Sequence, residues 1–235
     1  MNLILLEARE AAIPLAPDDP RAVHVLKVLR RGEGDLFDAG IVNGPRGKAT
    51  ISSIGPAGIA FTFEATVEAT EPDPIHLLVA LSRPQTARKI LNEASALGVA
   101  SIRFFQSEKG EPGYASSTLW STPEWRRHLM DGAAQAFDTR LPEVLHTTTL
   151  AECLASIPKE CVRVALDNYE SPSRLSPWLR TRPVALAFGP ERGWSGPERI
   201  LLRSGGFELA HLGARVLRTE TAVVAALAIV KAANA

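Results

Sequence analysis

The segment Val184–Phe188 reads VALAF and is followed directly by Gly189. Every residue in it is apolar, and the earlier stretch Val162–Leu166 is nearly as apolar. Strands of a parallel sheet are covered on both faces, so they read as continuous apolar runs rather than as alternating ones. The two stretches therefore predict buried parallel strands.

Around these two strands, further strands alternate with helices from residue 75 onward. Strands are expected at 75–81, 101–106 and 207–212, and helices at 85–97, 124–137, 197–203 and 219–233. This alternation predicts an α/β domain with a mostly parallel sheet. The helix 219–233 is apolar on nearly every face, which indicates burial all round and favours a homodimer in which the second copy covers part of it.

The first seventy residues have a different pattern. The runs 48–54 and 59–67 are short and rich in β-branched and aromatic residues, and a turn containing glycine and proline precedes each. One helix is expected near Pro20, because proline suits a first helical turn. We therefore expect a small β-barrel domain at 1–70, an extended proline-containing linker at 71–74, and the α/β domain at 75–235.

The composition excludes several classes of protein. Of the 235 residues, 46% are hydrophobic and 22% are charged, which is typical of a globular chain. The formal net charge is +0, so RNA binding would need a local basic face rather than bulk charge. No apolar segment is long enough to span a membrane, and the spacing of Cys153, Cys161 and the histidines fits no metal site. These features predict a cytoplasmic protein without membrane or metal binding.

Three strand ends are candidate ligand sites, because ligands of open α/β sheets bind outside the carboxyl ends of the strands. They are followed by the segments 167–169, 189–195 and 213–221. The second and third each place glycine directly after an apolar strand, then charged residues, then a helix start at which Ser195 and Thr219 are expected caps. The glycines could also serve only as tight turns. Dinucleotide, P-loop and hydrolase fingerprints are absent, so the residues alone predict an α/β ligand-binding domain.

The two glycine-containing loops resemble those of a known family. The segment 186–198, LAFGPERGWSGPE, is similar to the pattern IGPEGGFS..E, and the segment 212–222, LGARVLRTETA, is similar to LG.RILRTETA. Weaker similarity extends over 24–35, 97–102 and 135–144. These patterns are those of the RsmE-type ribosomal RNA uracil-N3 methyltransferases of the SPOUT superfamily. The chain departs from them at Arg192, where the family has glycine, and at Ala96 and Ala134, where it has acidic residues.

The resemblance implies a fold and an activity. It implies a PUA-like N-terminal barrel, a SPOUT domain with a C-terminal trefoil knot, and a homodimer. It also implies that S-adenosyl-L-methionine (SAM) is the cofactor and that uridine N3 of 16S ribosomal RNA is methylated, usually at uridine 1498. Another RNA nucleotide or a ribose hydroxyl is an alternative target, and an inactive RNA-binding assembly factor is an alternative from another class.

The chemistry selects the candidate catalytic residues. Uracil N3 must lose its proton before it can accept a methyl group, and the resulting charge spreads over O2 and O4. A cation near these oxygens lowers the pKa of N3, and a carboxylate can accept the proton. Arg218 is the candidate cation, while Glu191 and Glu220 are candidate proton acceptors or partners of the methionyl ammonium group.

The resemblance and the charge pattern complete the list of expected site residues. The cofactor site implied by the resemblance comprises Leu166, Phe188, Gly189, Pro190, Glu191, Gly193, Leu212, Gly213, Val216, Leu217, Arg218 and Thr221. Residues 21–31 include several basic residues and no acidic one, which favours either RNA contact or a solvated helix face. Candidate RNA-binding residues are Arg21, His24, Lys27, Arg30, Arg31, Arg46, Lys48, Arg83, Arg88, Lys89 and Arg215.

Overall fold

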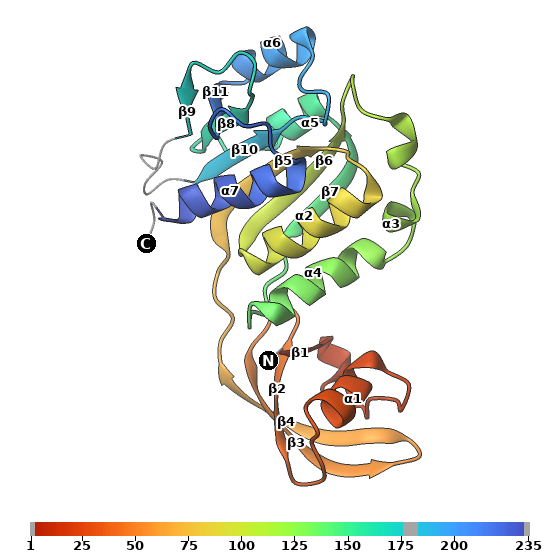
Figure 1. Cartoon of the computed structure of the whole chain (residues 1–235). Helices are drawn as coiled ribbons and strands as arrows, with labels where there is room; N and C mark the ends of the chain where they lie inside the picture. Colours follow the sequence, from red (N-terminus) through yellow and green to blue (C-terminus); the bar gives the residue numbers. More distant parts are fainter. Residues whose placement is uncertain (1–2, 176–182, 233–235) are drawn as a thin grey trace. The chain divides into compact units, whose positions relative to one another are not determined.

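The computed structural model describes residues 3–175 and 183–232, and the chain divides into two compact units (Figure 1). The first unit comprises Met1–Glu71 together with Met130–Leu141. The second comprises Pro72–Leu129 and Pro142–Ala235. Residue 233, the expected last residue of the final helix, lies outside the described residues.

The first unit is built on a four-stranded sheet in the order β1-β2-β3-β4. The strands are β1 (Ile4–Leu6), β2 (Leu36–Ile41), β3 (Arg46–Gly55) and β4 (Gly58–Val67). β1 pairs with β2 in parallel, and the other two pairings are antiparallel. The helical segments are η1 (Ala8–Glu10), α1 (Pro20–Val23) and the π-helical turn η2 (His24–Val28). The expected β-rich region with a helix near Pro20 is therefore present.

One segment of the first unit comes from far along the chain. Ala133 is fully buried in a small core with Leu3 and Leu5, and the backbone N–H of Leu3 donates to the Ala134 carbonyl oxygen at 3.1 Å. Ala133 lies near the end of α4 (Glu124–Gln135), a helix that begins in the second unit. A hydrophobic pattern shows that a helix face is buried but not which residues bury it, so the sequence did not assign this segment.

The second unit contains a seven-stranded sheet in the order β7-β6-β5-β10-β8-β11-β9. Its strands are β5 (Asp73–Ala80), β6 (Val99–Gln106), β7 (Glu143–Thr149), β8 (Val162–Leu166), β9 (Ser173–Arg174), β10 (Val184–Phe188) and β11 (Glu208–His211). The pairings between these strands are parallel. The predicted α/β class is confirmed, and the apolar run 184–188 forms a buried strand between β5 and β8.

Helices cover both faces of this sheet (Figure 1). They are α2 (Pro84–Ala96), α3 (Thr118–Ser121), α5 (Leu150–Ala155), α6 (Gly196–Ser204), α7 (Thr219–Ala232) and the 3-10 turn η3 (Pro112–Tyr114), with the start of α4. α2 and α7 pack side by side on one face. α5 and α6 contribute Leu154 and Leu202 to a core on the other face.

Several expected boundaries are wrong. Asp73 and Pro74 open β5 instead of belonging to a linker, because Asp73 pairs with Val99 across the sheet. α7 begins at Thr219 as predicted, so the residue that precedes the helix is Arg218 rather than the expected cap Thr219, and the Ala222 N–H donates to the Arg218 carbonyl oxygen at 2.8 Å. The sequence reading also missed the strand β7, which lies at a sheet edge and is more polar than the central strands.

Candidate functional site

The carboxyl ends of β8, β10 and β11 border a cavity of about 110 Å³ in the second unit. Its lining comes from the segments that follow these strands and from the start of α7. The lining residues are Leu166, Asp167, Asn168, Tyr169, Phe188, Gly189, Pro190, Glu191, Gly193, Trp194, Leu212, Val216, Leu217, Thr219 and Ala222. We call this the first cavity.

Most of the residues expected at the cofactor site line the first cavity. Gly213, Arg218 and Thr221 do not, and the remaining expected residues do. Thr221 is exposed on the first turn of α7, whereas Thr219 and Ala222 face the cavity. The sequence pattern does not distinguish between these positions, because the orientation of the first helical turn depends on how α7 packs.

Gly189 is required by close packing at the floor of the cavity. A Cβ atom at this position would lie 3.0 Å from the indole ring of Trp194. That ring is held in place, because its N–H donates to the Leu166 carbonyl oxygen at 2.9 Å and its face stacks on Phe105 with ring centroids 5.9 Å apart. Trp194 is 1% exposed, so its ring packs in the interior of the unit.

Gly193 is required by its backbone conformation. Its φ angle is +70°, in the left-handed region that favours glycine. A Cβ atom there would also lie 3.1 Å from the ring of Tyr169. The two glycines of this loop therefore act through close approach and backbone geometry, and both let the chain turn tightly around the first cavity.

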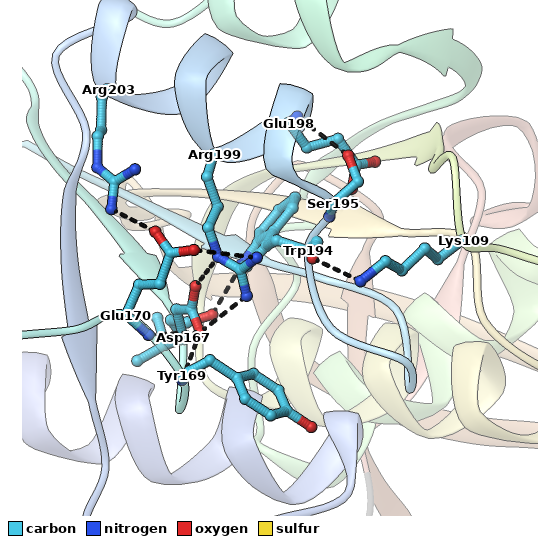
Figure 2. Close-up of polar contacts among 10 residues, drawn as sticks. Lys109, Asp167, Tyr169, Glu170, Trp194, Ser195, Glu198, Arg199 and Arg203 are labelled. Carbon is cyan, nitrogen blue, oxygen red and sulfur yellow. Dashed lines mark hydrogen bonds and ion pairs between the residues drawn. The ribbon is translucent and has the colours of Figure 1, made fainter.

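A buried ion pair joins the end of β8 to α6 (Figure 2). Asp167 is buried, and its carboxylate accepts from the Arg199 Nε at 2.5 Å and from the backbone N–H of Tyr169 at 2.7 Å. Burial alone would raise the pKa of Asp167, but the hydrogen bond from Arg199 and the backbone donors together lower it. Arg199 also pairs with Glu170 at 3.5 Å. This network holds the segment 167–170 beside the cavity.

A second set of contacts holds the loop after β10. Glu198 is buried, and its Oε1 accepts from the Ser107 hydroxyl at 2.7 Å and from the Glu108 N–H at 3.0 Å. The expected capping box is present, since Ser195 Oγ accepts from the Glu198 N–H and Glu198 Oε2 from the Ser195 N–H. Lys109 Nζ donates to the Trp194 carbonyl oxygen at 2.9 Å (Figure 2). The sequence did not identify Ser107 and Lys109, because they lie far along the chain from their partners Glu198 and Trp194.

A second cavity, of about 380 Å³, lies beside the first and is lined by polar residues. Its lining residues are Arg83, Gln85, Thr86, Lys89, Glu191, Arg218, Thr219 and Glu220. Glu191 and Thr219 line both cavities. All three candidate catalytic residues, Glu191, Arg218 and Glu220, therefore line one cavity, which adjoins the candidate cofactor site.

Glu220 is held as a carboxylate in the second cavity. Lys89 Nζ lies 3.3 Å from its Oε1. Burial alone would raise the pKa of Glu220, but a hydrogen bond from its own backbone N–H and the charges of Lys89 and Arg218 together lower it. A carboxylate at the start of a helix is also favoured by the helix dipole. Lys89 comes from α2, so the pair joins two helices distant in sequence.

The candidate RNA-binding residues differ in their surroundings. Lys27, Arg30, Arg31 and Arg215 are exposed. Arg21 is partly buried and forms ion pairs of 2.7 Å with both Glu10 and Asp19, which raise its pKa. Three other candidates form single ion pairs: Lys48 with Asp38, Arg88 with Glu124, and Lys89 with Glu220. Arg46 and Arg83 have no ion pair within the described ranges. His24 is partly buried at the start of η2.

Among residues 3–175 and 183–232, no helix has the length and apolar character needed to cross a membrane. Over the same ranges, no cluster of histidine, cysteine, aspartate and glutamate side chains is arranged to hold a metal ion.

Comparison with known proteins places this geometry in a family. The family described as an RNA methyltransferase domain matches residues 69–231. The ribosomal RNA small subunit methyltransferase E of Treponema pallidum is 33% identical, over 99% of this chain and 91% of the relative. Similar solved structures include a Legionella pneumophila methyltransferase in complex with SAM, with a TM-score of 0.80, 24% identity and coverage of 100% of this chain and 98% of that one. They also include a Neisseria gonorrhoeae ribosomal RNA small subunit methyltransferase E bound to SAM, with a TM-score of 0.79, 23% identity and the same coverage.

The two solved structures share the fold of this chain over its whole length, in agreement with the expected α/β architecture. The family match covers the second unit almost completely, and the Treponema relative extends the relationship over both units. The chain therefore belongs to the RNA methyltransferase family, within the group of the ribosomal RNA small subunit methyltransferases E.

Proposed function

We propose that this protein transfers the methyl group of SAM to N3 of a uridine in 16S ribosomal RNA. The observation that carries the proposal is the adjacency of the two cavities, which share Glu191 and Thr219. The first cavity suits a cofactor and the second a nucleotide, so the reacting atoms would meet at these two residues.

The lining of the first cavity fits SAM. Phe188, Leu212 and Leu217 offer apolar surface for a flat adenine ring. Gly189 and Gly193 let the loop after β10 pass close to Trp194 and Tyr169, which leaves its backbone beside the first cavity. When bound, SAM supplies an electrophilic methyl group on a sulfonium centre.

The second cavity supplies the groups that prepare N3. Arg218 lines it and would stabilise the negative charge that develops on the uracil oxygens. Glu191 lines both cavities, so its carboxylate is the better placed of the two candidates to accept the N3 proton. Glu220 is paired with Lys89 and is better suited to holding that cation than to accepting a proton. Alignment of N3 with the methyl group provides the rest of the catalysis.

The protein is further proposed to act as a homodimer in the cytoplasm, where ribosomal subunits are assembled. α7 buries one face, which includes Val223 and Leu227, within its own unit but leaves Ala228 exposed, so this chain alone does not bury the helix all round. Ile200 on α6 is 68% exposed, and Val216 beside the first cavity is 79% exposed. These two exposed apolar side chains are the candidate contacts with the second copy. Light scattering at micromolar concentration should give the mass of two chains, and a single-chain mass would refute the dimer.

Cofactor binding and target are tested separately. Calorimetry should show binding of S-adenosylhomocysteine (SAH) and no binding of NAD, and folded protein that gives no heat with SAH would contradict the proposed activity. Mass spectrometry of 16S ribosomal RNA from a deletion strain should show the loss of one N3-methylated uridine. Loss of a methyl group from another base or from a ribose would keep the enzyme class and change the target. Unchanged RNA modification would favour an assembly factor without activity.

A further inference from the structure

We propose that the second cavity binds the phosphodiester group of the target nucleotide, and that this phosphate takes Lys89 away from Glu220. The inference rests on the proposed function, because it concerns how that function's substrate is held. It assigns a ligand to a cavity whose cationic residues come from two helices far apart in the sequence.

The charges of the cavity suit a single anion. Arg83, Lys89 and Arg218 face two carboxylates, Glu191 and Glu220, which leaves one positive charge in excess. Among the residues that the structure describes, the side chains of Arg83 and Arg218 have no hydrogen bond or ion pair. A phosphodiester carries one negative charge and can accept hydrogen bonds from several arginine and lysine donors at once.

The position of the cavity also suits a phosphate. Gln85 and Thr86 belong to the first turn of α2, and Thr219 and Glu220 to the first turn of α7. Both helices begin beyond the carboxyl ends of strands, after β5 and β11, and they pack on each other. The partial positive charge at two helix starts adds to the charge of the three cationic side chains.

The Glu220 carboxylate is an anion that already pairs with one cation of the second cavity. The side chain is only 14% exposed, and its Oε1 lies 3.3 Å from Lys89 Nζ, near the charge of Arg218. A phosphate that contacts both Arg83 and Lys89 is held by two cations, whereas Glu220 pairs with Lys89, so the phosphate can compete for Lys89. Arg218 then remains available for the oxygens of the uracil. Since the cavity shares Glu191 and Thr219 with the first one, a nucleotide with its phosphate here has its base near the cofactor.

The test compares two probes, uridine 5′-monophosphate and uridine, on the full chain saturated with SAH. Calorimetric or NMR titration should show that the wild-type protein binds the monophosphate more tightly than the nucleoside. Arg83→Gln and Lys89→Gln should each weaken monophosphate binding by roughly 10- to 100-fold, because a hydrogen bond to a charged group usually contributes that much to affinity. Both variants should leave uridine binding unchanged. Lys159→Gln is the matched control, since Lys159 is exposed just before β8, at the opposite end of that strand.

Glu220→Gln tests whether the phosphate replaces Glu220 as the partner of Lys89. The direction of the change in affinity for the monophosphate decides this. If phosphate and Glu220 compete for Lys89, this variant should bind the monophosphate more tightly than the wild type. Weaker binding would overturn the exchange, because it would mean that Glu220 helps to build the site. Equal binding of monophosphate and nucleoside by the SAH-bound wild type, or no effect of Arg83→Gln and Lys89→Gln, would overturn the phosphate site.

Retained SAH binding in each variant shows that the fold is intact. It also separates the two proposals. A wild-type protein that does not bind SAH contradicts the proposed function, whereas one that binds SAH but does not prefer the monophosphate contradicts only the phosphate site.

Discussion

Arg218 lines the second cavity next to Glu191, and its side chain forms no ion pair with any described residue. A guanidinium so placed can act on charge that develops during the reaction. We expect Arg218→Ala to lower kcat by roughly 10²- to 10³-fold, the usual effect of removing one such donor, and to leave SAH binding unchanged. Single-turnover rates at saturating RNA measure this. A near-normal rate would mean that another group stabilises the uracil anion.

Gly189 leaves no room for a side chain, because a Cβ atom would lie 3.0 Å from the Trp194 ring. We expect Gly189→Ala to lower the free energy of unfolding by about 1–3 kcal/mol and to weaken SAH binding, since relieving the overlap moves the floor of the first cavity. Gly196→Ala is the control, because no atom lies within 4 Å of its Cβ position. Denaturant unfolding and calorimetry check both variants, and equal stability would show that the loop adjusts without cost.

At the scale of elements, the Asp167–Arg199 pair ties the end of β8 to α6. Arg199→Met would leave the buried Asp167 carboxylate without its cation, so we expect the free energy of unfolding to fall by about 3–5 kcal/mol. Arg203→Met removes an exposed partner of Glu170 on the same helix and should cost about 1 kcal/mol or less. Similar losses in the two variants would show that burial of the first pair is unimportant.

The same pair makes a prediction about pH. Burial opposes ionisation of Asp167, but Arg199 and the backbone donors lower its pKa below the ordinary value, so the carboxylate stabilises the folded protein at neutral pH. This contribution is lost as the pH falls below about 4, where the unfolded chain binds more protons than the folded one. In Arg199→Met the buried carboxylate has no cation beside it, so protonation of Asp167 raises the free energy of unfolding of the variant. The stability gap between wild type and variant should therefore narrow from pH 7 to pH 3, and a constant gap would contradict this assignment.

At the scale of the whole molecule, the exposed cations of the first unit are the candidates for wider RNA contact. Lys27, Arg30 and Arg31 are exposed, whereas Arg21 is held by Glu10 and Asp19. Replacing the three exposed residues with glutamine should weaken binding to 16S ribosomal RNA and reduce the slope of log K against log salt by about one unit per lost phosphate contact. SAH binding should not change. An unchanged slope would place the RNA contacts elsewhere.

Local patterns predicted much of the fold. β8 and β10 have the predicted boundaries, and Gly98, with φ of +71°, follows α2 as expected for a helix end. These features depend on short runs of apolar residues and on single backbone conformations, which the sequence carries directly. β7 and the end of α4 were missed or misassigned because an edge strand lacks the continuous apolar run, and because a helix face does not name what covers it.

The α/β class, the two glycine-containing loops and the strand ends that border the first cavity all follow from local sequence patterns. Which charged residues meet there depends on the tertiary structure. Lys89 and Glu220 are 131 residues apart, and Arg199 is 32 residues from Asp167. Such contacts depend on the order of strands in the sheet, β5 beside β10 and β11 beside β8, and on how the helices pack on it. Pairing between distant segments is set by the packing of the whole sheet, which no local pattern records.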